Sequence, residues 1–234
     1  GISGRGALDA RKRHVLEFMA RGPNQFETSS LGTYDQHFLG YEGPWLKLAA
    51  GDQIFHVSRL LESSRFARGM QASVRRGGLE AGAMSYQPRF YKDITSAWAG
   101  YASYELPGRF TIGLNYLNKE LQEQRGNAAL YSATVKGAPY QWVNLEAELA
   151  QGKLGERQGM AYYGGLDLRV RSVSLHSSVL RAGMDYPGYY SNTANYAVNL
   201  NATLSRRFTT TAGFNQDRSN LALDTLFYAA PLSS

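Results

Sequence analysis

The stretch YAVNLNATLSRRF, residues 196–208, changes character at every second position. Apolar side chains stand at positions 196, 198, 200, 202 and 204, and small or polar ones stand between them. Successive side chains of a β-strand point to opposite faces, so this spacing predicts a strand with one apolar and one polar face. The fold class then depends on whether the apolar face meets a protein core or a lipid bilayer.

The same alternation recurs along most of the chain. It runs through residues 46–50, 70–74, 110–116, 143–149 and 166–179. We predict about thirteen strands of roughly 10 to 13 residues, which is long compared with the usual five or six. A strand that crosses a bilayer needs about 9 to 11 tilted residues, so these lengths favour a membrane protein.

Turn-forming residues separate the predicted strands. Short signals such as Gly43-Pro44, Gly77-Gly78 and Pro107-Gly108 alternate with longer polar stretches, such as residues 151–159 and 185–195, which we expect to be loops. This rhythm predicts strands joined up and down in one antiparallel sheet, and no linker interrupts it. We therefore expect a single β-barrel domain, or part of one, over residues 1–234, with an irregular N-terminal segment at residues 1–10.

The composition narrows the class of protein. Aromatic residues make up 12% of the chain, which is too many for a disordered protein. The lack of cysteine excludes disulfides, a thiolate zinc site and a cysteine nucleophile. The net charge of +6 favours an anionic partner, for which we expect lipopolysaccharide. Nucleic acid is not expected, because the basic turns have no platform of stacking aromatic residues. No cofactor is predicted.

The polar faces of the predicted strands separate a lipid-facing barrel from a soluble sandwich. A face in bulk water is normally rich in charged residues, whereas Asn, Ser, Gly and Ala dominate here. Such faces fit a barrel interior, and the apolar faces, including Ile112, then contact the lipid bilayer. The charged side chains expected inside the barrel are Lys47, Arg75, Glu146, Glu148, Asp167, Arg169 and Arg171.

Taken together, these patterns resemble a Gram-negative outer-membrane β-barrel over nearly the whole chain. The resemblance implies an all-β, up-and-down antiparallel transmembrane barrel in the bacterial outer membrane, with short periplasmic turns and longer extracellular loops. The ending LFYAAPLSS lacks the terminal aromatic residue of many such barrels, so a segment of a larger barrel is also considered. Residues 43–73 are locally similar to a hairpin of pilus ushers, although no plug domain follows them.

Two groups of residues suggest chemistry. His176 shares a strand face with two serines, but no acidic residue beside it in the sequence orients its ring. Glu146 and Glu148 lie two apart on one strand, a spacing compatible with a pair of catalytic carboxylates. We favour a charge ladder between these glutamates and Arg169 and Arg171 on the next hairpin. The chain is therefore not predicted to be an enzyme.

Three functions remain open at this point. The first is a barrel that forms a polar pore for transport or export. The second is a structural barrel in an envelope or secretion complex, whose bore is filled by a plug or by an envelope protein partner. The third is a soluble all-β binding protein. Conductance separates the first two, and extraction without detergent would establish the third.

Overall fold

Most of the alternating stretch at 196–208 lies in strand β13 (Thr193–Ser205) of the computed structural model. Val198 and Leu204 on its apolar face are exposed rather than packed against a second sheet. The structure describes residues 1–22, 35–90, 94–122, 126–205 and 208–219. Over these residues the alternation therefore produces a wall with an apolar outer surface.

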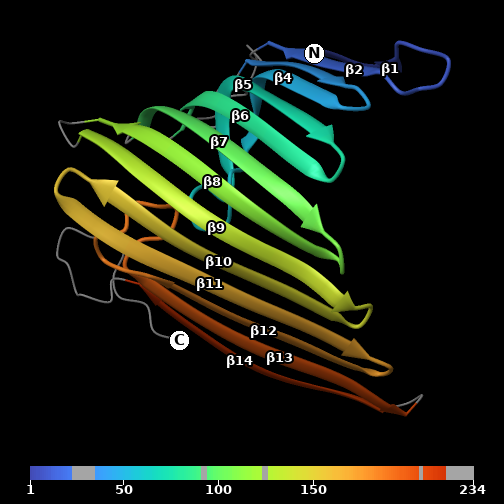
Figure 1. Ribbon diagram of the computed structural model, residues 1–234, viewed down its shortest axis with the longest axis vertical. Coiled ribbons are helices and arrows are strands. Elements are labelled where there is room, and N and C mark those ends of the chain that lie inside the picture. Colours follow the sequence, from blue (N-terminus) through green and yellow to red (C-terminus); the bar gives the residue numbers. More distant parts are fainter. Residues whose placement is uncertain (23–34, 91–93, 123–125, 206–207, 220–234) are drawn as a thin grey trace.

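The described residues form 14 strands and no helix (Figure 1). The other strands are β1 (Ile2–Ala7), β2 (Val15–Arg21), β3 (Gln36–Glu42), β4 (Leu46–Phe55), β5 (Arg65–Arg76), β6 (Leu79–Pro88), β7 (Ile94–Leu106), β8 (Phe110–Leu121), β9 (Gly126–Tyr140), β10 (Val143–Leu154), β11 (Arg157–Val170), β12 (Val173–Ala182) and β14 (Phe208–Ser219). Among the described residues, no helix is long and apolar enough to cross a membrane.

All 14 strands belong to one curved sheet in which each strand pairs with its neighbours in the sequence (Figure 1). Each of these pairs is antiparallel, from β1 with β2 to β13 with β14. The predicted all-β, up-and-down fold is therefore confirmed. In the described part of the chain, β1 and β14 are the two edges of the sheet and do not pair with each other.

Three local predictions need correction. Residues 1–10 are not irregular, because Ile2–Ala7 pairs with β2 as strand β1. The strand number is 14 in the described residues, and the N-terminal strands are short, with six or seven residues each in β1, β2 and β3. The loop expected at residues 151–159 is also wrong, because β10 and β11 continue to a tight turn at Gly155, whose φ of 59° suits glycine.

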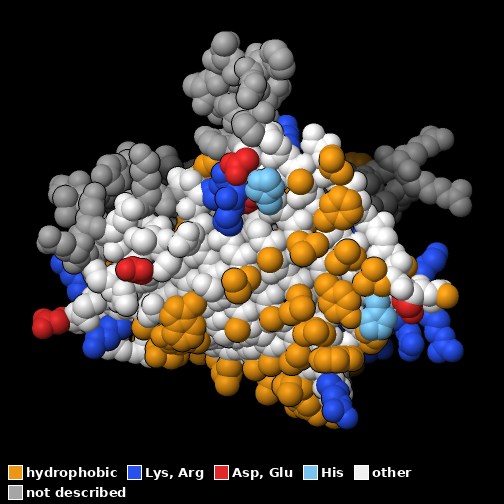
Figure 2. All heavy atoms as spheres, turned by 90° about the horizontal axis from the view of Figure 1, so that it is seen from above, with side chains coloured by type: hydrophobic (Ala, Val, Ile, Leu, Met, Phe, Trp, Pro, Cys, Tyr) orange, Lys and Arg blue, Asp and Glu red, His pale blue; other side chains and the backbone are white. Residues whose placement is uncertain are grey.

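The two faces of the sheet differ in character. On the outer face, apolar side chains are exposed at alternate positions, as with Ile112 (44%), Leu114 (68%) and Leu149 (63%). Figure 2 shows such side chains as a broad band across one side of the wall. The buried hydrophobic cluster lies on the opposite, inner face and includes Phe55, Leu60, Leu61, Tyr86, Leu117, Leu130 and Tyr186. The core of the protein is thus inside the curve of the sheet.

Candidate functional site

The connection between β4 and β5, residues 56–64, folds against the inner wall of the sheet; we call it the inner loop. A β-bridge between Ser58 and Glu62 closes it, and the Val57 N–H donates to the Glu62 carbonyl at 2.9 Å. Its tip residues Leu60 and Leu61 are completely buried. A loop with a buried apolar tip has a defined position, because exposing two leucines again would cost about 1.5–3 kcal/mol each.

A second connection, residues 183–192 between β12 and β13, holds the tip of the inner loop; we call it the tyrosine loop. The Tyr186 hydroxyl and the Tyr189 N–H both donate to the Leu60 carbonyl, at 3.2 and 2.9 Å. The pKa of Tyr186 is raised because burial disfavours its charged form, so the hydroxyl stays a donor. A Cβ on Gly159 would lie 2.2 Å from the Tyr186 nitrogen, so glycine permits this close approach.

A buried ion cluster fixes the other side of the inner loop. Glu62 is fully buried and accepts from Arg65 at 2.9 Å, and Lys119 Nζ lies 3.5 Å from its second oxygen. The Tyr86 hydroxyl also reaches this carboxylate, at 3.4 Å. Removing one partner of a buried pair typically costs about 3–5 kcal/mol, because the remaining charge stays out of water. The cluster therefore opposes movement of the inner loop.

Arg59 of the inner loop contacts polar side chains of the inner wall. Its Nη2 lies 3.0 Å from Glu146 Oε2, and its guanidinium lies 4.0 Å from the centre of the Tyr163 ring. The other Glu146 oxygen lies 3.0 Å from Lys136 Nζ. Burial acts to lower the pKa of Arg59, but the hydrogen bond to Glu146 and the Coulombic contributions of Tyr163, Glu146 and Tyr190 together outweigh it, so the pKa is raised. The guanidinium thus remains a fixed positive charge in the interior.

Directly beside this group is a polar cavity of about 340 Å³ in the inner wall. Its lining includes hydroxyl, amide, acidic and basic side chains from β8 to β11: Thr111, Lys136, Asn144, Glu146, Tyr163 and Asp167. The surface of this cavity therefore offers hydrogen-bond donors and acceptors, together with groups of both charges. No group of three or more His, Asp or Glu side chains in the described ranges is arranged to hold a metal ion.

The predicted interior residues occupy two regions of the inner wall. Glu146 and Glu148 contact the inner loop, since Glu148 Oε2 accepts from the Leu60 N–H at 3.3 Å. Asp167 lines the polar cavity, and its carboxylate lies 2.6 Å from His176 Nδ1. An acidic partner for His176 therefore exists, although the sequence did not place one beside it.

The remaining predicted residues lie nearer the short connections. Lys47 pairs with Glu42 at 2.9 Å and Arg75 with Glu105 at 2.5 Å. Arg169 is the penultimate residue of β11, and its N–H bonds the carbonyl that precedes β10. Arg171 lies in the following turn with a φ of 51°.

The predicted charge ladder from the two glutamates to Arg169 and Arg171 is wrong. The register places Glu146 opposite Gly165 and Lys136, and Glu148 opposite Tyr163 and Thr134. Both arginines lie at the turn, several residues away along the hairpin. Lys136 and Arg59 neutralise Glu146 instead. Strand alternation does not reveal the inner loop, although its apolar residues Val57, Leu60 and Leu61 are a signal of burial in the sequence.

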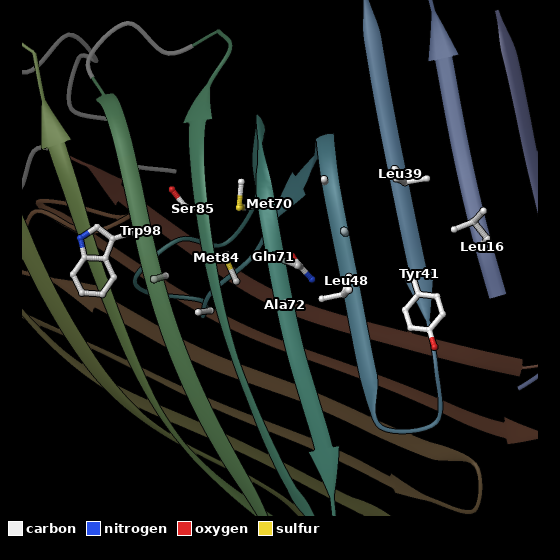
Figure 3. Close-up of a pocket in the computed structure, with 14 residues that line it drawn as sticks. Leu16, Leu39, Tyr41, Leu48, Met70, Gln71, Ala72, Met84, Ser85 and Trp98 are labelled. Carbon is white, nitrogen blue, oxygen red and sulfur yellow. The ribbon is translucent and has the colours of Figure 1, made fainter. Parts of the chain in front are cut away.

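The outer face carries an apolar depression of about 660 Å³, lined among others by Leu16, Leu39, Leu48, Met70 and Trp98 (Figure 3). These side chains come from five strands between β2 and β7, and alanines form part of the lining. The depression offers almost no polar contact. It continues the apolar surface of the wall and has no feature of a solute site.

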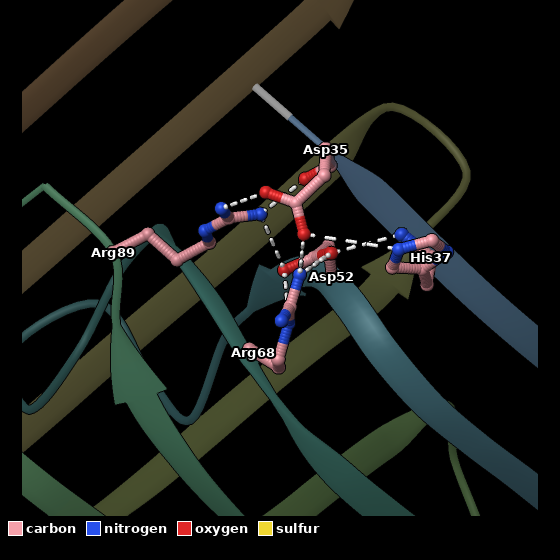
Figure 4. Close-up of polar contacts among 5 residues, drawn as sticks. All are labelled: Asp35, His37, Asp52, Arg68 and Arg89. Atoms are coloured by element: carbon pink, nitrogen blue, oxygen red, sulfur yellow. Dashed lines mark hydrogen bonds and ion pairs between the residues drawn. The ribbon is translucent and has the colours of Figure 1, made fainter. Parts of the chain in front are cut away.

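An ion cluster lies on the same outer face, at the ends of β3 to β6 (Figure 4). Asp52 is fully buried and pairs with Arg68 at 2.9 Å and Arg89 at 3.1 Å, and Asp35 pairs with the same two arginines at 2.9 and 2.7 Å. His37 Nε2 lies 3.7 Å from Asp35. Hydrogen bonds from Arg89 and Arg68 lower the pKa of Asp35 to about 2. Two acids neutralise two arginines here, so the cluster is saturated.

Comparison with known proteins finds similar structures but no related sequence. No protein-family model and no curated protein matches the chain. A porin structure refined at 1.8 Å resolution is 11% identical, with a TM-score of 0.57, and the match covers 94% of this chain and 89% of that one. Two mutants of Rhodopseudomonas blastica porin are 8% identical, with TM-scores of 0.56 and 0.55, and the matches cover 93% and 92% of this chain and 83% of theirs.

This likeness shows the fold. The chain has the porin-like, up-and-down antiparallel barrel fold, and the matches extend over nearly its whole length. They give no support to the local similarity of residues 43–73 to pilus ushers.

Proposed function

We propose that the chain forms a polar pore in the bacterial outer membrane through which small hydrophilic solutes pass, narrowed by the inner loop. The observation that carries the proposal is the contact of Arg59 with Glu146 and Tyr163, which places the inner loop beside a polar cavity inside an apolar-walled sheet. A porin-like fold favours a channel over an enzyme, and we expect no catalytic activity.

The difference between the two faces of the sheet supports a location in the outer membrane. Exposed apolar side chains on the outer face fit contact with lipid, and polar side chains on the inner face fit contact with water. In this arrangement the short connections, such as residues 77–78, face the periplasm, and the end with the inner loop and the tyrosine loop faces outward. The outer membrane is the compartment in which barrels of this type are found.

We expect the interior to select solutes by their size more than by their charge. Lys136 and Arg59 balance Glu146, while Asp167 pairs with His176. Acidic and basic groups thus lie close together around the polar cavity. We expect weak ion selectivity and a limit on solute size set by the inner loop.

The test is single-channel recording of the purified, refolded chain in planar lipid bilayers. Steady steps of current are expected, together with entry of small sugars into proteoliposomes. A variant in which residues 57–61 are replaced by a short Gly-Ser linker should conduct more, provided that its strand content by circular dichroism is unchanged. If neither protein conducts, the pore proposal fails, and the structural barrel with a filled bore becomes the better description.

A further inference from the structure

We propose that the outer surface of β10, β12 and β14 binds the phosphate groups of lipopolysaccharide in the outer leaflet. This inference rests on the proposed outer-membrane location, because that leaflet is where such a lipid is met. It goes further by assigning the partner to three named side chains: Lys153, Arg181 and Arg218.

The three cations occupy the same place in their strands. Lys153 is the penultimate residue of β10, Arg181 of β12 and Arg218 of β14. Alternate strands of an up-and-down sheet run in the same direction, so all three residues lie at the end of the wall that holds the tyrosine loop. The parallel-running strands β10, β12 and β14 thus carry three positive charges at one rim of the wall.

Their side chains point outward, by the alternation of each strand. Leu149, four residues before Lys153, is 63% exposed on the apolar face, and Phe214, four residues before Arg218, is 58% exposed. Arg181 pairs in register with Tyr162, which is 40% exposed. The three cations therefore lie on the outer face. They are closer to the rim of the wall than the exposed apolar side chains, which would contact the acyl chains of the lipid.

The charges of these three residues are not neutralised within the described part of the chain. None of them forms an ion pair with a described acidic residue, whereas nearby Arg157 reaches Asp185 at 4.0 Å. Arg218 donates to the Gln216 amide at 2.8 Å when that amide is oriented to accept, which leaves its charge uncompensated. The ion cluster of Arg68 and Arg89 on β5 and beyond β6 differs, because two aspartates saturate it.

Phosphate is the anion that this arrangement fits. Lysine and arginine above a band of exposed apolar side chains match a lipid whose phosphates lie at the interface and whose acyl chains lie below. Arginine can bind phosphate through two parallel N–H groups, so Arg181 and Arg218 provide direction as well as charge. The bis-phosphorylated lipid A part of lipopolysaccharide carries both features.

The test is native mass spectrometry of the full chain in neutral detergent, titrated with bis-phosphorylated lipid A. The variant Lys153→Gln, Arg181→Gln, Arg218→Gln should bind it at least about tenfold more weakly, since each cation contributes to attraction at a membrane surface. The matched control is Arg11→Gln, Lys12→Gln, Arg76→Gln, which removes the same charge at the opposite end of the wall. Circular dichroism confirms that both variants fold.

The possible results distinguish a specific lipid A site from nonspecific binding of lipids. Loss of lipid A binding in the first variant alone supports the site. Equal weakening in the control variant, equal binding of dephosphorylated lipid A, or equally tight binding of phosphatidylglycerol would each overturn it. Neither variant changes the interior contacts of the inner loop, so conductance in planar bilayers tests the pore proposal independently of this result.

Discussion

Arg59 Nη2 lies 3.0 Å from Glu146 Oε2, although 87 positions separate the two residues in the chain. This ion pair connects the inner loop to β10 on the inner wall. It fixes the position of the Arg59 guanidinium relative to the polar cavity.

Replacing Glu146 by glutamine is expected to shift the weak ion selectivity of the pore toward anions. The change removes a negative charge from the interior and frees both Lys136 and Arg59 from their partner. Loss of a part-exposed pair should lower the free energy of unfolding by about 1 kcal/mol. The measurement is the reversal potential in a salt gradient. Glu105→Gln is the matched control, because Glu105 pairs with Arg75 away from the inner loop. An equal shift in both variants would contradict a special role for Glu146.

Replacing Glu62 by glutamine is expected to destabilise the protein by about 3–5 kcal/mol, because Lys119 is 3% exposed and would keep a buried charge without its acid. Adding Lys119→Met should restore much of this loss, since the uncompensated charge is removed. The measurement is urea unfolding in detergent followed by tryptophan fluorescence. If the double variant is less stable than Glu62→Gln alone, the assigned coupling is wrong.

Replacing Tyr186 by phenylalanine should cost only about 0.5–1.5 kcal/mol, because the Tyr189 N–H still donates to the Leu60 carbonyl. Replacing it by alanine should cost about 3–5 kcal/mol, because the fully buried ring leaves a cavity. The alanine variant should also release the tip of the inner loop, which would appear as increased current noise. Quiet recordings from a folded alanine variant would show that the tyrosine loop does not hold the inner loop.

The contribution of Asp35 to stability should depend on pH. Hydrogen bonds from Arg89 and then Arg68 lower its pKa in the folded state from 3.8 to about 2. The unfolded state therefore takes up the proton first, so the stabilisation is fully present above about pH 4–5 and is lost as the pH falls through about 2.

Thermal unfolding of the wild type and of Asp35→Asn tests this dependence. The two proteins should differ in melting temperature near neutral pH and converge as the pH falls through about 2, because the carboxylate then becomes protonated in the folded state as well. A constant difference across this range would mean that Asp35 does not act through its charge.

Local periodicity was sufficient to predict the strands and their two faces. A strand turns its side chains by half a turn at each residue, so the pattern of Ile112 and Leu114 can be seen without knowledge of any distant residue. The same reasoning predicted the up-and-down order, since the turn signals lie between consecutive strands. It could not predict that Arg169 and Arg171 lie away from Glu146, because the register of the β10–β11 hairpin depends on where its turn closes, here at residues 155–156.

The sequence by itself determined an all-β wall with one apolar and one polar surface, since alternation is a property of neighbouring residues. Only the tertiary structure decided that residues 56–64 fold inward. The contacts of Leu60 with Glu148 and Tyr186 join strands far apart in the chain, and they exist only after the sheet has curved and brought β10 and the tyrosine loop to face β4. A linear pattern contains no such curvature, so the position of the inner loop could not be deduced from it.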